Sequence, residues 1–156
     1  MEIVYLETTF FSFYHDERTA PAIVAMRDWT RQFWYERRND YDLVTSEAVL
    51  GELRKGGAHH KDAALKMALT IPLLPAATEI AGIVQTYVKH KVMPRDPAGD
   101  ALHLALASFH ACDYLVTWNC RHLANANKFC HIRDINRLLG LKSPELVTPQ
   151  ELLGEI

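Results

Sequence analysis

The apolar segments of this chain alternate between short continuous runs and longer stretches with helical spacing. Ile3, Val4, Tyr5 and Leu6 form a continuous run, which is typical of a strand covered on both faces. Residues 21–38 instead carry apolar side chains three and four positions apart, which predicts a helix. Because helical segments stand between successive strands, the strands can run parallel between helical layers. The sequence therefore predicts an α/β fold with a central parallel sheet flanked by helices on both faces.

Capping and helix-breaking residues set the boundaries of these elements. Ser46 is a typical N-cap, Gly56 and Gly57 stop a helix, and Asp96 with Pro97 is a strong helix start. We expect helices at residues 21–38, 47–55, 60–69, 79–92 and 96–111, with shorter helical pieces at 121–126 and 134–139. We expect strands at residues 3–6, 43–45, 71–75, 113–117 and 146–148, and a terminal turn from Pro149.

Length and composition exclude several classes of protein. The 156 residues suffice for one domain, residues 1–156, and their composition of 49% hydrophobic and 23% charged residues is ordinary for a globular protein. The apolar runs are too short for a membrane span, and the acidic N-terminus does not resemble a signal peptide. Three cysteines, an odd number, argue against a disulfide framework. We therefore expect a cytoplasmic protein, and its net charge of −2 by itself does not indicate nucleic-acid binding.

One charged residue stands in the most apolar of the expected helices. Asp100 shares a helical face with Leu104, Ala107 and Ala111. An ionised carboxylate buried beside such side chains costs roughly several kcal/mol unless something compensates its charge. The segment therefore predicts a buried acid that needs a compensating partner.

Two further acids and one amide are placed where they could join Asp100. Glu7 directly follows the first strand, Glu52 lies on the helix after the second strand, and Asn119 follows the strand expected at 113–117. In an open parallel sheet, ligands bind beyond the carboxyl ends of the strands. Hard cations such as Mg²⁺ and Mn²⁺ prefer oxygen ligands and can activate water against a phosphodiester. Convergence of Glu7, Glu52 and Asp100 would therefore create a metal site suited to phosphodiester hydrolysis, completed by Asn119.

Each of these residues also has a purely structural interpretation. Glu7 could be a solvated residue at a strand end, and Glu52 could form a surface ion pair with a neighbouring cation. Asp100 could be stabilised by the helix dipole or by a bond to His103, and Asn119 could be a turn residue. Spacing alone leaves both interpretations open.

Four segments place these residues in a recognisable context: YLETT at 5–9, SEAVLGEL at 46–53, GDALHLA at 99–105 and LVTWN at 115–119. In this order they resemble the PIN-domain nucleases, specifically the VapC-like toxins of bacterial type II toxin–antitoxin pairs. The resemblance runs nearly end to end and implies a PIN-like fold and a Mg²⁺- or Mn²⁺-dependent endoribonuclease. It makes Glu7, Glu52 and Asp100 the three catalytic, metal-binding acids, with Asn119 where many members have a fourth acid. The first-strand acid of the family is usually aspartate, so both Glu7 and Asn119 depart from its pattern.

The resemblance also implies the partners, which are an RNA substrate, a second copy in a homodimer and an antitoxin whose tail occludes the active site. The predicted substrate contacts are Arg121, Thr117 and Thr8, and Arg121 lies beside Trp118, where a cation and an aromatic ring could meet phosphate and base. The aromatic-rich segment 29–35 is compatible with a dimer seam or a groove for a partner helix. Other basic residues that could flank the acids and hold an RNA backbone are Arg54, Lys55, His59, His60, Lys61, Lys89, Lys91, Arg95, His122 and Lys128.

Three other functions stay open at this point. The same fold could be a non-catalytic RNA- or protein-binding module with a degraded site, or a DNA nuclease that uses the same acids. A zinc site is a third alternative, although the spacing of its candidate ligands matches no CxxC-type finger. These candidate ligands are Cys120, His122, Cys130 and His131.

Overall fold

The computed structural model describes residues 1–57, 60–93 and 99–154. It contains a four-stranded sheet in the order β2-β1-β3-β4, and every pair of neighbouring strands is parallel. The strands are β1 (Ile3–Leu6), β2 (Asp42–Val44), β3 (Tyr114–Val116) and β4 (Glu145–Val147). The α/β fold with a central parallel sheet is therefore confirmed.

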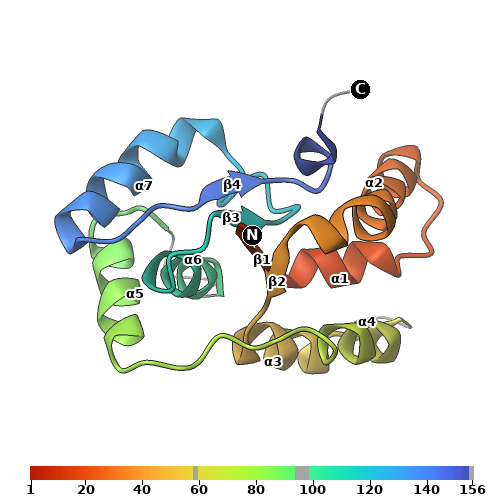
Figure 1. The fold of residues 1–156 in the computed structure, drawn as a ribbon, viewed down its shortest axis with the longest axis horizontal. Helices are drawn as coiled ribbons and strands as arrows, with labels where there is room; N and C mark the ends of the chain where they lie inside the picture. Colours follow the sequence, from red (N-terminus) through yellow and green to blue (C-terminus); the bar gives the residue numbers. More distant parts are fainter. Residues whose placement is uncertain (58–59, 94–98, 155–156) are drawn as a thin grey trace.

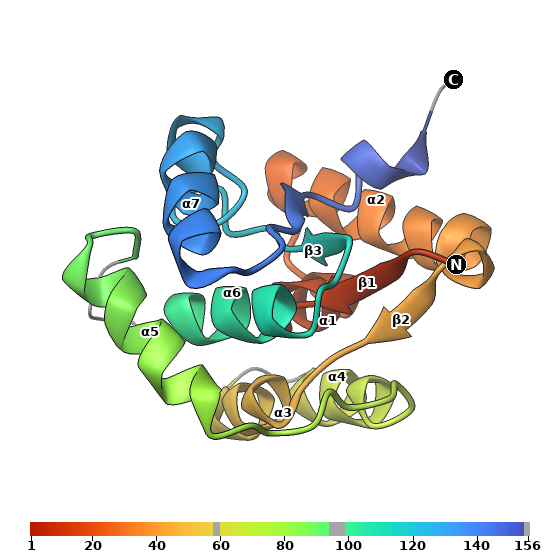
Figure 2. The ribbon, with the colours of Figure 1, turned by 60° about the vertical axis from the view of Figure 1, so that its left-hand side comes forward.

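Helices cover both faces of this sheet. Figure 1 shows α1 and α2 on one side and α5, α6 and α7 on the other, with α3 and α4 below the β2 edge. In Figure 2, α5 crosses beside one end of α6, against which it packs. The helices are α1 (Thr8–Tyr14), α2 (Pro21–Arg37), α3 (Glu47–Lys55), α4 (Lys61–Ala68), α5 (Glu79–Lys89), α6 (Gly99–Phe109) and α7 (Ala126–Leu139), with 3-10 turns η1 (Arg38–Asp40) and η2 (Glu151–Leu153).

The strand order explains this arrangement. The chain leaves β1 for β2 on one side, then crosses back over β1 to β3 and continues outward to β4. Because parallel crossovers are right-handed, connections that run in opposite directions along a sheet place their helices on opposite faces. The direction reverses between β1 and β3, so the carboxyl ends of these two neighbouring strands border the crevice where ligands of such folds bind.

Local sequence explains α3 and α6 well. Ser46 caps α3 by accepting a hydrogen bond from the Val49 backbone N–H, as its residue type predicts. Asp100 is buried in α6, as expected, together with Leu104 and Ala107, whereas Ala111 lies beyond the helix and is exposed. The remaining buried residues of α6 are Ala101, His103, Ala105, Leu106 and Ser108. The helix start expected at Asp96 and Pro97 lies outside the described residues.

Four elements differ from the expectations. The helical piece expected at 121–126 is not a helix, because residues 121–124 form a turn and a bend before α7 begins at Ala126. The helix α1 was not predicted, because its sequence TTFFSFY is rich in β-branched and aromatic residues, which are common in strands. The N-cap of this helix is Glu7. Residues 71–75 form only an isolated bridge between Thr45 and Leu73, because Pro72 and Pro75 cannot donate backbone hydrogen bonds to a sheet. The helical piece expected at 134–139 is the second half of α7, which begins after its N-cap Asn125.

None of the helices in the described ranges is both long and apolar enough to cross a membrane.

Candidate metal centre

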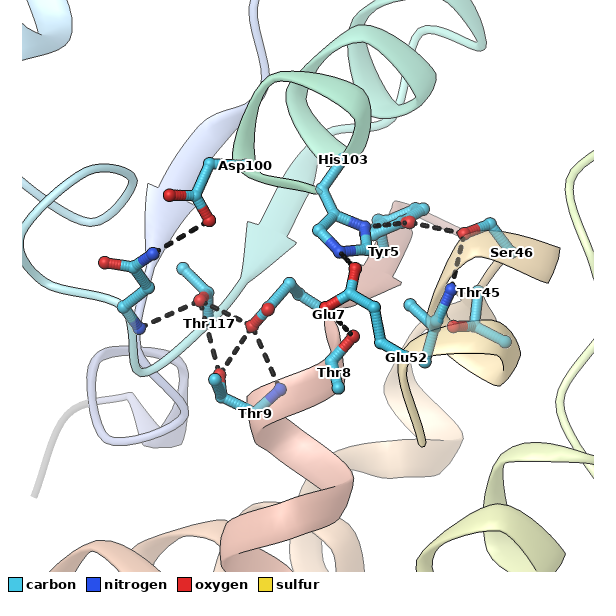
Figure 3. Close-up of polar contacts among 12 residues, drawn as sticks. Tyr5, Glu7, Thr8, Thr9, Thr45, Ser46, Glu52, Asp100, His103 and Thr117 are labelled. Carbon is cyan, nitrogen blue, oxygen red and sulfur yellow. Dashed lines mark hydrogen bonds and ion pairs between the residues drawn. The ribbon is translucent and has the colours of Figure 1, made fainter. Parts of the chain in front are cut away.

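Polar residues directly follow the neighbouring strands β1 and β3. Glu7 follows Leu6, and Thr117 follows Val116, which is the register partner of Leu6. Asp100 and His103 project from α6, and Glu52 from α3, toward the same region (Figure 3). Four segments that lie far apart in the sequence therefore contribute side chains to one edge of the sheet.

Glu7 is held by a set of donors on one of its two oxygens. Its Oε2 accepts the Thr9 backbone N–H at 3.0 Å, the Thr9 hydroxyl at 2.5 Å and the Thr117 hydroxyl at 2.7 Å. Glu7 is 4% exposed and forms no ion pair with a lysine or arginine in the described part of the chain. As the N-cap of α1 it also lies at the positive end of the helix dipole. These contacts hold Oε2 in place and leave Oε1 for another partner.

Glu52, in contrast, is held by contacts to both of its carboxylate oxygens. Its Oε1 lies 2.5 Å from His103 Nε2, and its Oε2 accepts the Thr8 hydroxyl at 3.2 Å. Burial by itself raises the pKa of Glu52, but the hydrogen bond and charge of His103 and the hydrogen bond of Thr8 outweigh it, so the pKa is lowered. The surface ion pair considered from the sequence does not form, since Arg54 pairs with Glu47 at 3.4 Å.

His103 brings these two glutamates into one cluster. One donor atom each from Glu7, Glu52 and His103 lies within 4.8 Å of the others. The sequence placed His103 beside Asp100 as a bonding or packing neighbour, because the two residues are three positions apart on one helix. Its contact with Glu52 depends on how α6 packs against α3 and β1, which helical spacing cannot give.

Asp100 lies beside this cluster and is not one of its three members. Its Oδ1 accepts the Asn119 side-chain N–H at 2.9 Å, and its buried Oδ2 has no hydrogen-bond partner among the described residues. Asp100 is 6% exposed, and this burial raises its pKa. The charges of His122 and His103 and the hydrogen bond from Asn119 oppose the shift without cancelling it. The expected convergence of three acids is thus observed for Glu7 and Glu52, with Asp100 adjacent.

Asn119 points its nitrogen, not its oxygen, at the acids. Its Oδ1 accepts the backbone N–H groups of Arg121 at 3.2 Å and His122 at 3.1 Å. Because a backbone N–H can only donate, these two bonds fix the orientation of the amide. Asn119 therefore presents a hydrogen-bond donor at the place where the family pattern often has a fourth carboxylate.

The predicted substrate contacts occupy different environments. The Thr117 side chain is fully buried and its hydroxyl bonds to Glu7, so it is placed to orient Glu7. Thr8 is half-buried beside Glu52, and Arg121 is exposed. The ring of Trp118 stacks on that of Trp29, with 6.2 Å between the ring centroids, so it packs against the protein itself. His59 and Arg95, two of the expected basic residues, lie outside the described residues.

The residues present fit a hard divalent cation. Carboxylate oxygens are its preferred ligands, and the lone Oδ2 of Asp100 is a buried anionic atom without a donor in the described ranges. Over residues 1–57, 60–93 and 99–154, the candidate zinc ligands Cys120, His122, Cys130 and His131 form no cluster with ligand geometry.

No protein-family model matches this chain, and no curated protein matches it significantly.

Proposed function

We propose that this protein is an endoribonuclease that hydrolyses RNA phosphodiester bonds with Mg²⁺ or Mn²⁺ held by Glu7, Glu52 and Asp100. The observation that carries the proposal is the buried Oδ2 of Asp100, which lacks a donor within the described part of the chain beside two further carboxylates. Such a group of negative charges costs free energy in a folded protein unless a cation compensates it. A structural role alone leaves this cost unexplained.

The side chains around the acids suit the reaction. A divalent ion at this site would polarise the scissile phosphate and make an attacking water more acidic. Thr9 and Thr117 hold Glu7 in one orientation, and His103 and Thr8 hold Glu52. The Asn119 amide offers a donor beside Asp100 that can stabilise negative charge on a phosphate oxygen.

We further propose that the protein is the toxin of a type II toxin–antitoxin pair, acts as a homodimer and is restrained by its antitoxin. The support is the resemblance in four segments, each of which supplies at least one residue of the site described above. Glu7 comes from the first segment, Glu52 from the second, Asp100 from the third and Asn119 from the fourth. Expression should arrest growth, and co-expression of the adjacent gene product should relieve the arrest.

The direct test is cleavage of a mixture of cellular RNAs by the purified protein with Mn²⁺, with Mg²⁺ or with EDTA. We expect cleavage only with metal, and a rise in melting temperature with Mn²⁺ in the absence of RNA. DNA oligonucleotides should stay intact. Cleavage of both polymers would favour the DNA nuclease alternative, and a protein that neither cleaves RNA nor binds Mn²⁺ would be the non-catalytic binding module.

A first prediction concerns the glycine that faces Glu52. A Cβ atom at Gly99 would lie 3.0 Å from Glu52 Oε1, so Gly99→Ala should displace this carboxylate rather than the backbone. We expect roughly tenfold weaker Mn²⁺ binding with nearly unchanged stability, measured by calorimetry and thermal melting.

Gly82→Ala is the matched control, because a Cβ at this helical position of α5 meets nothing within 4 Å. It should stabilise the protein by up to about 1 kcal/mol and leave Mn²⁺ affinity unchanged. Equal Mn²⁺ affinities for the two variants would count against a role of Glu52 in metal binding.

A further inference from the structure

A chain of buried hydrogen bonds leads from the start of α3 to Glu52 on the same helix. The Ser46 Oγ lies 2.6 Å from the Tyr5 hydroxyl, which lies 2.7 Å from His103 Nδ1. His103 Nε2 then lies 2.5 Å from Glu52 Oε1 (Figure 3). Tyr5 and His103 are almost completely buried, so water cannot replace either partner. The chain therefore links β1 and α6 with the N-cap and the Glu52 position of α3.

The direction of the hydrogen bonds in this chain follows from its ends. Ser46 Oγ accepts the Val49 backbone N–H, so its own hydrogen is free to bond to the oxygen of Tyr5. The Tyr5 hydroxyl lies 2.7 Å from His103 Nδ1 and can donate its hydrogen there. A neutral histidine that accepts at Nδ1 carries its hydrogen on Nε2. That hydrogen faces the Glu52 carboxylate.

The opposite tautomer is unfavourable at this position. With its hydrogen on Nδ1, His103 would turn the lone pair of Nε2 toward Glu52 Oε1 at 2.5 Å, so that two acceptors would face each other. The neighbouring buried positions of α6 are filled by Ala101 and Leu104, which need no partner. A buried histidine is stable here only because both of its ring nitrogens are bonded.

We propose that His103 is a positioning residue for Glu52, and that the Ser46–Tyr5 pair selects the Nε2–H tautomer with which His103 directs the Glu52 carboxylate toward Glu7. The inference rests on the proposed function in one respect, because the orientation of Glu52 matters for function only when Glu52 binds the metal. Partners that orient a metal-binding carboxylate typically change metal affinity by about ten- to a hundredfold when they are removed.

Two substitutions of His103 distinguish the roles of its two ring nitrogens. Glutamine can place an N–H donor where Nε2 stands, whereas the shorter asparagine can only reach the place of Nδ1. We expect His103→Gln to bind Mn²⁺ within about threefold of the unchanged protein, and His103→Asn to bind it about ten- to a hundredfold more weakly. Thermal melting of both in EDTA controls for the fold. Equal Mn²⁺ affinities for the two variants would overturn the proposal.

The tautomer can be measured without any metal. Burial lowers the pKa of His103, but the hydrogen bond of Glu52 and the charges of the neighbouring carboxylates outweigh it, so the pKa is raised. In ¹⁵N NMR spectra of the metal-free protein recorded at a pH above that pKa, the two ring nitrogens of His103 should show the shifts of an Nε2–H imidazole. Tyr5→Phe removes the donor to Nδ1 and should move these shifts toward a mixture of tautomers, with about tenfold weaker Mn²⁺ binding. An Nδ1–H imidazole in the unchanged protein would overturn the proposal.

The same measurements test the positioning role of His103 and the proposed nuclease function separately. If the unchanged protein shows the Nε2–H tautomer but neither binds Mn²⁺ nor cleaves RNA, the nuclease proposal fails while His103 still orients Glu52. If it binds Mn²⁺ and cleaves RNA equally well with asparagine at position 103, the nuclease proposal stands and the positioning role fails.

Discussion

Glu7→Gln should lower the rate of metal-dependent RNA cleavage by about a thousandfold while leaving the fold intact. The oxygen of a glutamine amide can still accept the bonds from Thr9 and Thr117 that now reach Glu7 Oε2. The amide nitrogen would then take the place of Oε1, so a neutral donor replaces the anionic oxygen that faces the cluster. Because the local hydrogen bonds survive, the loss should be confined to metal binding and chemistry. Single-turnover cleavage with saturating Mn²⁺ measures it.

The control for this variant is the same chemical change on a neighbouring helix. Glu47 is exposed, lies in the first turn of α3 and pairs with Arg54 at 3.4 Å. Exposed ion pairs contribute little to stability, so Glu47→Gln should behave like the unchanged protein in both cleavage and melting. A Glu7→Gln protein that melts normally and still cleaves RNA at the normal rate would rule out Glu7 as a catalytic acid.

Asp100→Asn should stabilise the metal-free protein and abolish its stabilisation by Mn²⁺. An unpaired neutral amide costs less to bury than an unpaired carboxylate, so we expect a gain of about 1 kcal/mol at pH 7, or about 2–4 °C in melting temperature. With Mn²⁺ at a hundred times its Kd, the unchanged protein should gain about 2.7 kcal/mol and the variant almost nothing. Thermal melting in EDTA and in Mn²⁺ measures both effects.

The sign of the pH dependence follows from the raised pKa of Asp100. In the unfolded chain an aspartate titrates near 3.9, roughly, and in the folded protein this residue titrates higher. Between the two pKa values the folded state binds more protons, so the free energy of unfolding falls as pH rises. Asp100→Asn lacks this fall, so its advantage should grow with pH and stay constant above the folded pKa.

Asp113→Asn is a control for which we expect the opposite change in the free energy of unfolding. The hydrogen bonds from Lys142 and from the Ile3 backbone N–H lower the pKa of this carboxyl. The ionised form therefore stabilises the folded state above the unfolded pKa, and Asp113→Asn should destabilise the protein at pH 7. If Asp100→Asn were also destabilising in EDTA, the carboxylate of Asp100 would have a structural partner and the metal interpretation would lose its main support.

Sequence patterns predicted the elements whose signals are local. The run that forms β1, the Ser46 cap of α3 and the apolar periodicity of α6 depend on residues within a few positions of each other, and all three were correct. The helix α1 was missed because its seven residues favour a strand by their own propensity. Contacts with α2, α3 and α4 stabilise it as a helix, and these contacts come from outside its own seven residues.

In the candidate site, too, local features could be predicted from the sequence and features set by tertiary packing could not. The burial of Asp100 could be predicted, because it follows from the apolar residues on its own helix face. The insertion of His103 between Tyr5 and Glu52 depends on three elements meeting, and the orientation of Asn119 depends on the backbone of the turn that follows it. Such geometry is decided by tertiary packing, on which sequence spacing carries no information.

The three carboxylates differ in how far they reach the solvent. The side chain of Glu52 is 40% exposed, whereas Glu7 and Asp100 are almost fully covered. If the proposed ion binds here, it should meet Glu52 first and lose part of its hydration shell there before it reaches the covered oxygens of Glu7 and Asp100. Glu52 should govern how fast the ion is captured, and the two covered acids should govern how long it stays.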